Sequence, residues 1–491
     1  MDIATARNAG MDCVSVTWGF RTVEELQAAG AAAMINRPEE LLALIETSGK
    51  ETEMEREMET AAPVKWLSKF PENREITVSV PGSKSITNRA LLLAALSQGT
   101  CHLKGVLFSD DSRGFLDCLI KLGFNIEINE KKKEVIIEGT GGRIPDRKAS
   151  INVRSAGTAA RFLTVMLAMA GGDYELTASP QMCKRPMEPL LSLLEACGVT
   201  FEFHGEEGHF PFEIHSKGIK SGNIKIDTTT SSQYASALLM ASVMNGMNVE
   251  LTGSRVDGAY IKITTNMLKQ FDIDFDREGN TYIIKKQSYI CNVYNVEPDM
   301  SAACYFYAMA AILGVKSIVK GIHKDSMQGD IKFIYALERI GCVITDKPEG
   351  LEVDGTSAVG YEGIDIDMSD FSDQALTMAV VAAFGKTETR IRNIGHIRGQ
   401  ESDRVQVIVN ELNRMGCDAK IVEEGGSTDV IITPGKLHGA EIETYDDHRV
   451  AMSFAVAGLA VDGIVIKNPM CCRKTFENYF GVLETIEKED E

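Results

Sequence analysis

The sequence predicts an α/β protein with two domains, each built from three repeated units of helices and strands. Three observations predict this fold class. A serine or aspartate precedes a strongly apolar helical run at six positions, separated by 72, 76, 68, 74 and 74 residues: Ser83, Ser155, Ser231, Asp299, Asp373 and Asp447. A glycine-marked turn and a strand-like stretch follow these runs. A second helix and a hairpin-like stretch then complete each unit except the sixth.

The first helix of each unit combines a polar start with an apolar body. Serine and aspartate are good N-caps because their side-chain oxygens accept hydrogen bonds from the first free amides. The runs behind them, such as Ala90–Leu96, Phe162–Ala170 and Ala235–Met244, are too apolar for surface helices. Helix N-termini carry partial positive charge and free N–H groups. Six buried helices with polar starts therefore predict one shared site that favours anions.

The sixth unit lacks its hairpin, because the chain ends soon after Phe480. We expect the strand-like segment Glu75–Val80 to fill the vacant place. The chain would then enter through the second domain, build the first, and return, crossing near Pro81–Lys84 and Glu297–Met300. The expected division is a phosphatase-like segment (1–49), a charged linker (50–63), a first domain (83–298) and a second domain (64–82 with 299–491). Two domains joined by two crossings can close on a ligand.

Residues 1–49 do not follow the repeat. The stretches DIATARNAGM, WGFR and PEELL resemble the C-terminal end of haloacid-dehalogenase-like phosphatases of the phosphoglycolate phosphatase kind. The resemblance matches Asp2 to the last acidic residue of that family's metal-binding motif. The nucleophilic aspartate of such enzymes lies near their start, and this sequence does not supply it. We expect a fusion remnant or appendage without phosphatase activity.

Charge and composition exclude several function classes. The formal net charge of −19 argues against nucleic acid as a partner, because a phosphate backbone requires a basic face. Basic residues nevertheless gather near the predicted helix starts: Lys84, Arg89, Arg161, Arg185, Arg398, Arg404, Arg449 and Lys474. This pattern indicates a small anionic ligand. The eleven cysteines lack paired spacing and fit reduced thiols in the cytoplasm. Neither a membrane span nor a signal peptide is predicted.

The segment Pro81–Arg89 (PGSKSITNR) carries the sharpest local signal. Pro and Gly turn the chain out of a strand, Ser83 can cap the helix, and Lys84 lies at its mouth. Arg89 follows about one helical turn later and faces roughly the same way. A lysine and an arginine beside free amides can hold phosphate or carboxylate. The spacing of a nucleotide-binding Walker loop is absent.

Eight motifs occur in order: PGSKSITNRALLLAAL, SAGTAAR, KRPM, SSQYASALLM, SMQGDIKF, ESDR, YDDHRVAM and RKTFENYF. Together they resemble the 5-enolpyruvylshikimate-3-phosphate synthases over residues 64–491. The resemblance implies an inside-out α/β barrel in each of two domains, the enolpyruvyl transferase fold. It implies transfer of the enolpyruvyl group of phosphoenolpyruvate to the 5-hydroxyl of shikimate 3-phosphate, with release of phosphate. This step belongs to the shikimate pathway of aromatic amino acid biosynthesis.

The resemblance also implies binding residues for each substrate. For shikimate 3-phosphate they are Lys84, Ser85, Arg89, Ser231, Ser232, Gln233, Asp373, His396 and Gln400. For phosphoenolpyruvate they are Lys84, Gly157, Arg185, Gln233, Arg404, Arg449 and Lys474. The absence of a Cβ at Gly157 lets backbone amides approach an anion. A monomer is expected.

Two carboxyl groups can divide the proton transfers, one from the 5-hydroxyl and one to the methylene carbon, if their surroundings separate their pKa values. Asp373 is expected to begin a helix whose dipole favours its charged form, which suits the base. Glu401 is the candidate acid, Lys84 is placed between the substrates, and the resemblance assigns the same roles. The alternative is that Asp373 is a simple N-cap and Glu401 a structural ion pair. No metal and no cofactor are expected, because cations and helix ends can stabilise the charges.

Four positions depart from the family pattern. Ser155 stands where Asn is usual, Asp257 where Ser is usual, His396 where Asn is frequent, and Gln400 where Lys is frequent. A lost cation and a gained anion each predict a cost of about 1–3 kcal/mol to shikimate 3-phosphate binding. A protonated His396 would offset part of it. We therefore predict weaker binding or altered pH dependence, with the reaction intact.

Two other functions compete with this one. The sister enzyme that enolpyruvylates UDP-N-acetylglucosamine carries a reactive cysteine five residues before an Arg-Pro pair. Here Pro180 holds that place, and Cys183 lies two residues before Arg185. A non-catalytic binding descendant is the second alternative, suggested by Asp257 and Gln400.

Overall fold

The computed structural model describes residues 14–16, 26, 33–35, 65–66, 70, 75–229, 231–253 and 255–488. The chain divides into two compact units, Met1–Val64 and Lys65–Glu491. In the first unit, β1 (Val14–Val16) pairs in parallel with β2 (Ala33–Ile35). The rest of the predicted phosphatase-like segment and the predicted linker lie outside the described residues, apart from residue 26. The domain boundaries expected from the sequence stay a prediction.

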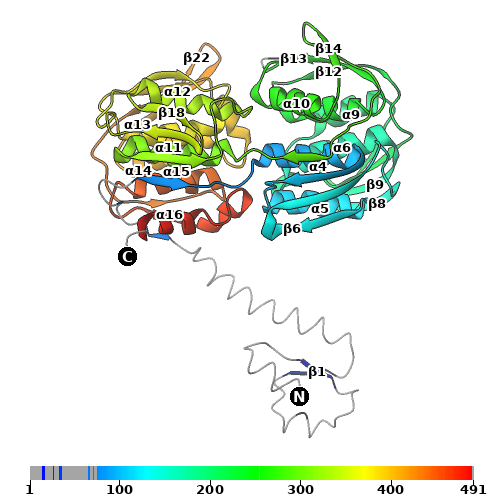
Figure 1. Cartoon of the computed structure of the whole chain (residues 1–491), viewed down its shortest axis with the longest axis horizontal. Coiled ribbons are helices and arrows are strands. Elements are labelled where there is room, and N and C mark those ends of the chain that lie inside the picture. Colours follow the sequence, from blue (N-terminus) through cyan, green and yellow to red (C-terminus); the bar gives the residue numbers. More distant parts are fainter. Residues whose placement is uncertain are drawn as a thin grey trace. The chain divides into compact units, whose positions relative to one another are not determined.

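The second unit forms two lobes, each around its own hydrophobic core (Figure 1). The core of the first lobe extends along the chain from Ile86 to Val296. The core of the second lobe contains four apolar residues between Phe70 and Val80 and further apolar residues between Met300 and Ile486. The predicted fold class, an α/β protein with an inside-out barrel of three units in each half, is confirmed.

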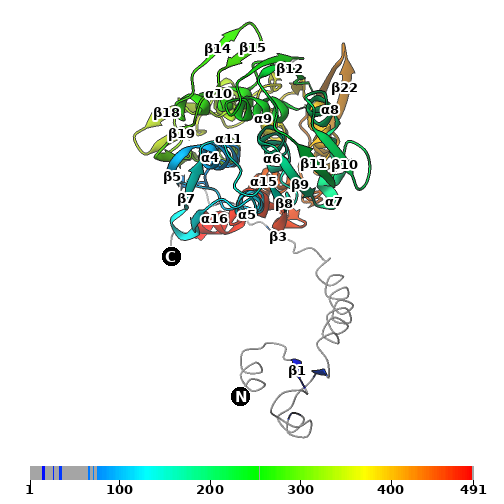
Figure 2. The same ribbon diagram turned by 90° about the vertical axis from the view of Figure 1, so that its right-hand side faces the viewer.

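Three almost completely buried helices lie inside each lobe, and Figure 2 shows the sheets of the first lobe around them. The inner helices are α4 (Lys84–Leu96), α6 (Gly157–Ala170) and α9 (Ser232–Ser242), then α11 (Met300–Leu313), α13 (Ala375–Ala383) and α15 (His448–Gly458). The other helices are α5 (Asp110–Lys121), α7 (Pro180–Cys183), α8 (Glu188–Ala196), α10 (Ala259–Gln270), α12 (Lys332–Arg339), α14 (Arg404–Arg414) and α16 (Tyr479–Lys488).

Each lobe carries three mixed sheets, in which strands that are neighbours in the order below are hydrogen-bonded to each other. The first lobe has β16 (Val293–Asn295), β5 (Gln98–Lys104), β7 (Glu134–Thr140), β6 (Ile126–Asn129); β10 (Thr200–Phe203), β11 (Phe212–Ser216), β9 (Gly172–Thr177), β8 (Lys148–Asn152); and β12 (Gly222–Asp227), β13 (Met247–Thr252), β15 (Thr281–Ile284), β14 (Phe275–Glu278). The second has β18 (Val343–Lys347), β19 (Gly350–Asp354), β17 (Lys316–Lys320), β4 (Ile76–Val78); β20 (Asp365–Asp367), β21 (Thr389–Arg392), β23 (Ser427–Thr433), β22 (Asp418–Glu424); and β24 (Glu441–Ile442), β25 (Val465–Ile466), β3 (Lys65–Trp66).

The lobes exchange one strand at the crossings. In the other four sheets, the strand before an inner helix pairs in parallel with the strand after it. Around α4 and α11 these partners are exchanged, because β4 pairs with β17 and β16 pairs with β5. The prediction that Glu75–Val80 fills the vacancy in the sixth unit is therefore wrong. Its strand belongs to the fourth unit, since β17 offers the parallel edge, and β3 joins the sixth unit.

The predicted helix starts agree with the structure to within two residues. Ser83, Ser231, Asp299 and Asp447 are N-caps, and the last three accept hydrogen bonds from the amides of their own helices. Two predicted caps are wrong. The N-cap of α6 is Ala156, because the Ser155 hydroxyl lies against Ser179 at 2.7 Å. Asp373 lies in the 3-10 turn η3 (Ser372–Gln374) that precedes α13.

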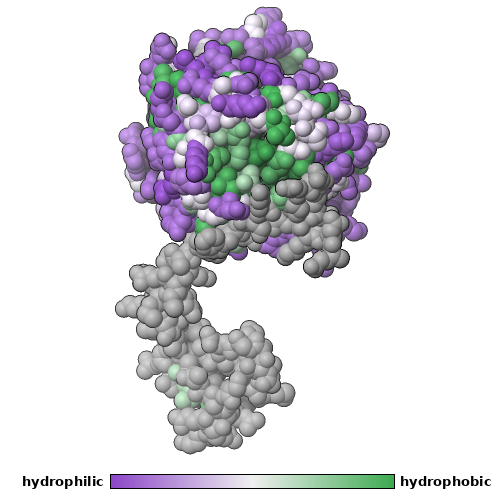
Figure 3. Space-filling view, turned by 90° about the vertical axis from the view of Figure 1, so that its left-hand side faces the viewer, coloured by the Kyte–Doolittle hydropathy of each residue, from purple (hydrophilic) through white to green (hydrophobic). Residues whose placement is uncertain are grey.

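In the part of the chain that the structure describes, no helix is both long and apolar enough to cross a membrane. The outer side of the second lobe shows an apolar area bordered by hydrophilic residues (Figure 3).

Candidate active site

A cavity of about 240 Å³ lies between the two lobes, where the starts of the inner helices meet. Every site residue that the sequence predicts lines this cavity: Lys84, Ser85, Arg89, Gly157, Arg185, Ser231, Ser232, Gln233, Asp373, His396, Gln400, Glu401, Arg404, Arg449 and Lys474. The lining comes from both lobes, so the site is complete only when the lobes lie together. The roles of these residues stay predictions.

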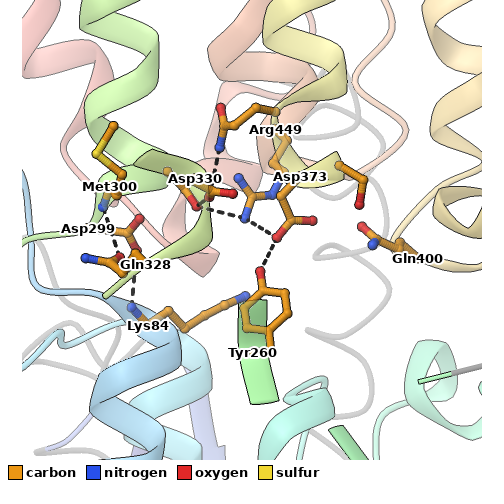
Figure 4. A network of polar contacts seen from close by, with 12 residues as sticks. Lys84, Tyr260, Asp299, Met300, Gln328, Asp330, Asp373, Gln400 and Arg449 are labelled. Atoms are coloured by element: carbon orange, nitrogen blue, oxygen red, sulfur yellow. Dashed lines mark hydrogen bonds and ion pairs between the residues drawn. The ribbon is translucent and has the colours of Figure 1, made fainter. Parts of the chain in front are cut away.

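The Asp373 carboxylate lies among three donors. Arg449 Nη2 is 2.9 Å from Oδ2, Arg404 Nη1 is 3.2 Å from Oδ1, and the Tyr260 hydroxyl donates to Oδ2 at 2.5 Å. Figure 4 shows Tyr260 and Arg449 directed at this carboxylate. Burial raises the pKa of Asp373, but Arg449, Arg404 and the Tyr260 hydrogen bond outweigh burial and lower it. The charged form is favoured as predicted, although cations rather than a helix start favour it.

Glu401 lies in a second set of contacts on the same arginine. Its Oε2 is 2.9 Å from Arg404 Nη2, and its Oε1 is 3.5 Å from Lys474 Nζ. Burial opposes ionisation, yet Arg404, Lys474 and Lys84 together hold the pKa of Glu401 well below its ordinary value. Without substrate, Glu401 is therefore an anion.

The first two turns of α4 bring two cations, Lys84 and Arg89, to the cavity. Lys84 Nζ is 3.4 Å from Asp111 Oδ2, and the Lys84 amide donates to Asp299 Oδ2 of the other lobe at 3.1 Å (Figure 4). Arg89 is fixed by Nε donating to Thr264 Oγ1 at 2.8 Å and Nη1 to the Ser85 carbonyl at 2.9 Å. Burial lowers the pKa of Arg89 to about 10, so it stays charged at neutral pH.

The first residue of α6 is Gly157, which has no side chain. A Cβ on Gly157 would lie 2.7 Å from Arg185 Nη1 and 3.1 Å from Arg161 Nη1. Arg161 donates to the Gly157 carbonyl at 3.2 Å. The glycine thus lets two guanidinium groups lie against the helix start, where free amides also attract anions.

A family model described as EPSP synthase (3-phosphoshikimate 1-carboxyvinyltransferase) matches residues 71–483. The 3-phosphoshikimate 1-carboxyvinyltransferase of Nostoc punctiforme is 43% identical over 410 residues, which cover 83% of this chain and 95% of that protein. One from Halalkalibacterium halodurans, named as number 2, is 36% identical over 434 residues, covering 86% and 95%. The EPSP synthase structure from Acinetobacter baumannii superposes with a TM-score of 0.72 at 26% identity, covering 86% of this chain and 98% of that one.

The chain belongs to the EPSP synthase family. The match of the EPSP synthase family model begins after residue 70 and includes both lobes and the cavity between them. The predicted resemblance of residues 1–49 to a phosphatase stays a prediction.

Two expectations about charged residues around this EPSP synthase site are wrong. Arg398 does not line the cavity, because it pairs with Asp403 at 2.9 Å and Glu423 at 3.1 Å. Asp257 does not face the cavity either, since it pairs with Arg277 at 2.7 Å and its side chain is 60% exposed. The predicted repulsion between Asp257 and an anionic ligand therefore loses its structural basis.

The three other departures from the EPSP synthase pattern, Ser155, His396 and Gln400, do line the cavity. Gln400 accepts a hydrogen bond from Arg404, and His396 Nε2 lies 2.6 Å from Ser372 Oγ. Burial, aided by Arg255, lowers the pKa of His396 to about 4. The expectation that a protonated His396 offsets the missing lysine is thus wrong at neutral pH, because the imidazole is neutral.

Polar cavity residues that sequence reasoning missed include Tyr260, Arg255 and Asp330. Arg255 precedes α10, Tyr260 is the second residue of α10, and Asp330 lies in η2 (Gly329–Ile331). Asp330 accepts hydrogen bonds from Ser301 and, at 3.1 Å, from Gln374. Asp330 lies within SMQGDIKF, a motif used only to identify the family, whereas no local pattern marked Tyr260 or Arg255.

Proposed function

We propose that this chain transfers the enolpyruvyl group of phosphoenolpyruvate to the 5-hydroxyl of shikimate 3-phosphate and releases phosphate. The observation that carries the proposal is the cavity in which the cations predicted to hold two anionic substrates surround the carboxylates of Asp373 and Glu401. Family membership supports the same reaction.

Shikimate 3-phosphate is held mainly by the first lobe. Ser231 and Ser232 bind its phosphate at the start of α9, where free amides and hydroxyls converge. Ser85 and the rigid Arg89 hold another part of the ligand. Gln233 reaches both substrates.

Phosphoenolpyruvate is held by cations from both lobes. Arg185 lies beside Gly157 at the start of α6, while Arg404, Arg449 and Lys474 come from the second lobe. Charge-assisted contacts of this kind bind carboxylate and phosphate groups strongly. Closing the lobes on these anions excludes water and strengthens each contact.

Asp373 accepts the proton of the 5-hydroxyl, since its cationic neighbours keep it ionised near neutral pH. Glu401 delivers a proton to the methylene carbon while the 5-oxygen bonds to the adjacent carbon of phosphoenolpyruvate. Loss of a proton from the resulting methyl group then breaks the carbon–oxygen bond to phosphate and restores the double bond. In the free protein Arg404 and Lys474 hold Glu401 as an anion, but an incoming anionic substrate competes for these same cations. Binding therefore raises the pKa of Glu401 and lets it take up the proton that it delivers. Lys84 lies between the substrates and stabilises charge in the intermediate.

The first experiment measures phosphate release from phosphoenolpyruvate with shikimate 3-phosphate and, in parallel, with UDP-N-acetylglucosamine. Release with shikimate 3-phosphate alone is expected. Release only with UDP-N-acetylglucosamine would overturn the substrate, and binding without any release would favour a non-catalytic descendant.

A second experiment tests the proton transfers. Asp373→Asn and Glu401→Gln are each expected to lower kcat by at least about 100-fold, while each substrate still binds. Glu423→Gln, on the exposed edge of β22, is the matched control and should leave kcat unchanged. An unchanged kcat in both site variants would contradict the assigned roles.

We also propose a cytoplasmic monomer. The cysteine pattern supports a reducing compartment. Sedimentation of the purified chain tests the monomer, because a dimer would double the measured mass.

A further inference from the structure

The start of α10 in the first lobe lies directly against η2 of the second lobe. A Cβ built on Gly329, the first residue of η2, would lie 2.2 Å from the Cβ of Ala259, the first residue of α10. Non-bonded carbon atoms are normally about 3.5–4.0 Å apart, so no side chain fits between the two backbones. Among the described glycines, Gly329 is not one with a positive φ, so its missing side chain matters for space rather than for backbone conformation. The lobes can approach this closely here because residue 329 is a glycine.

The loop that carries Gly329 is fixed on both sides. Gln328 Nε2 donates to the Pro298 carbonyl at 2.8 Å, and Gln328 Oε1 accepts from the Met300 amide at 3.0 Å (Figure 4). On the other side, Asp330 accepts hydrogen bonds from two side chains of the second lobe. A methyl group added at position 329 would therefore press on α10 instead of displacing its own loop.

The start of α10 is also held in place. Ile261 and Ile263 are buried in the core of the first lobe. Met327, two residues before Gly329, packs against that same core from the second lobe. Because both sides of the contact are anchored, an overlap between them can be relieved only by moving the lobes apart.

The contact adjoins the groups of the proposed function. Tyr260 follows Ala259 and donates from the first lobe to Asp373 of the second (Figure 4). Asp330 follows Gly329 and lines the same cavity. Restoring a normal carbon–carbon distance would take a separation of roughly 1.5 Å, which would break the Tyr260 hydrogen bond. It would also move Asp373 away from a ligand held by the first lobe.

We propose that Gly329 and Ala259 form a spacer of two small residues, which sets how closely the lobes approach each other beside the proposed base. Both are positioning residues, because they act through Tyr260 and Asp373 rather than on a substrate. A displacement of about 1 Å among reacting groups can lower a rate by about 100-fold. The effect on kcat rests on the proposed function, whereas the spacing of the lobes does not.

A swap of residue sizes in the full chain tests the spacer by steady-state kinetics. Gly329→Ala is expected to lower kcat by about 10- to 100-fold. Adding Ala259→Gly removes the opposing methyl group, after which the nearest atom to the new Cβ is the Asp370 carbonyl oxygen at 3.3 Å. The double variant should therefore recover kcat to within about threefold of Ala259→Gly alone. Without this recovery the spacer is overturned.

A matched control separates the contact from a general effect of adding a methyl group. Gly222→Ala places a Cβ where nothing lies within 4 Å, and it should leave kcat unchanged. A loss of kcat as large as that of Gly329→Ala would overturn the spacer.

Hydrogen exchange in the free chain tests the spacing without any turnover. Gly329→Ala should speed amide exchange over residues 258–262 and 326–331 by at least about fivefold and leave β7 unchanged, and the double variant should reverse this. Unchanged exchange on both sides of the contact would overturn the spacer, since the lobes would not have moved. Acceleration that includes β7 would also overturn it, because loss of the fold would then explain a lower kcat.

The two experiments separate this inference from the proposed function. If the unaltered chain releases no phosphate, the proposed function fails, but the exchange experiment still decides whether the spacer sets the distance between the lobes. If the unaltered chain is active and Gly329→Ala is equally active, only the spacer is overturned.

Discussion

Arg404 is the residue that connects the two proposed proton-transfer groups. Its side chain is 1% exposed, and Asp447 fixes it with contacts of 2.8 Å to Nε and 3.1 Å to Nη2. The remaining N–H groups donate to Asp373, Glu401 and Gln400. A substrate anion that binds Arg404 therefore competes with both carboxylates for this guanidinium. The orientation of the guanidinium is already fixed by Asp447.

Gly157→Ala should selectively weaken phosphoenolpyruvate binding. The added Cβ would lie 2.7 Å from Arg185 Nη1 and displace that guanidinium from its present position. Losing about one charge-assisted contact predicts a rise of roughly tenfold in KM for phosphoenolpyruvate, with KM for shikimate 3-phosphate nearly unchanged. Steady-state kinetics with each substrate varied in turn measure this. Gly222→Ala, where a Cβ meets nothing within 4 Å, is the control, and equal effects from both variants would contradict the prediction.

Tyr260→Phe should move the acid side of the pH–rate profile to higher pH. The lost hydrogen bond lowers the pKa of Asp373, so its removal raises that pKa towards the ordinary value. The proposed base is then protonated at a higher pH, and kcat begins to fall earlier as pH decreases, by up to about one unit. Values of kcat from about pH 4 to pH 8 measure the shift. A shift to lower pH would contradict the role of the hydroxyl.

At the scale of the elements, the starts of the inner helices explain why both lobes are needed. The caps satisfy the first amides of α9, α11 and α15, and the apolar bodies hold these helices in the two cores. Asp299 does more than cap α11, because Oδ1 accepts from the Ala302 amide at 3.1 Å while Oδ2 accepts from the Lys84 amide at 3.1 Å. One carboxylate thus joins the first turns of two helices from different lobes.

Asp299→Ala should destabilise the fold and loosen this joint. Loss of the cap alone predicts a decrease of about 1–2 kcal/mol in the free energy of unfolding, and loss of the bond to α4 adds to it. Denaturant unfolding followed by fluorescence measures the change. Asp299→Asn keeps an oxygen that can cap α11 and should lose less. Equal stability of the alanine variant and the unaltered chain would show that neither bond matters.

At the scale of the whole molecule, the two lobes are joined by two adjacent crossings. The Ser83 amide donates to the Glu297 carbonyl, and the Asp299 amide donates to the Pro81 carbonyl, both at 2.8 Å. Gly82 lies between these bonds, where a Cβ would be 1.9 Å from the Gly105 carbonyl oxygen. The strand before each crossing belongs to a sheet of the lobe that the chain is about to leave, since β4 pairs with β17 and β16 pairs with β5. Closure of the lobes must therefore bend short, tightly packed segments.

Deletion of residues 1–49 should leave catalysis unchanged. The family match begins at residue 71, and Lys65–Glu491 form a compact unit that contains the whole cavity. Because no cavity residue is removed, kcat and both KM values should agree with those of the full chain within about twofold. Parallel kinetics and thermal unfolding of the two chains measure this. A large loss of kcat with an intact fold would assign the segment a role in the reaction.

The sequence by itself determined the six helix starts to within two residues and the apolar helices behind them, and its resemblance to a known family supplied the candidate site residues that line the cavity. The helix starts follow from local rules, since a cap such as Ser231 acts on amides of its own helix and a cation near a helix start stays near it. Only the tertiary structure decided that β4 pairs with β17, that Asp257 pairs with Arg277, that burial keeps His396 neutral, and that Arg255 rather than Arg398 reaches the cavity. Strand partners, side-chain direction and burial depend on residues far away in the chain, so no local pattern encodes them.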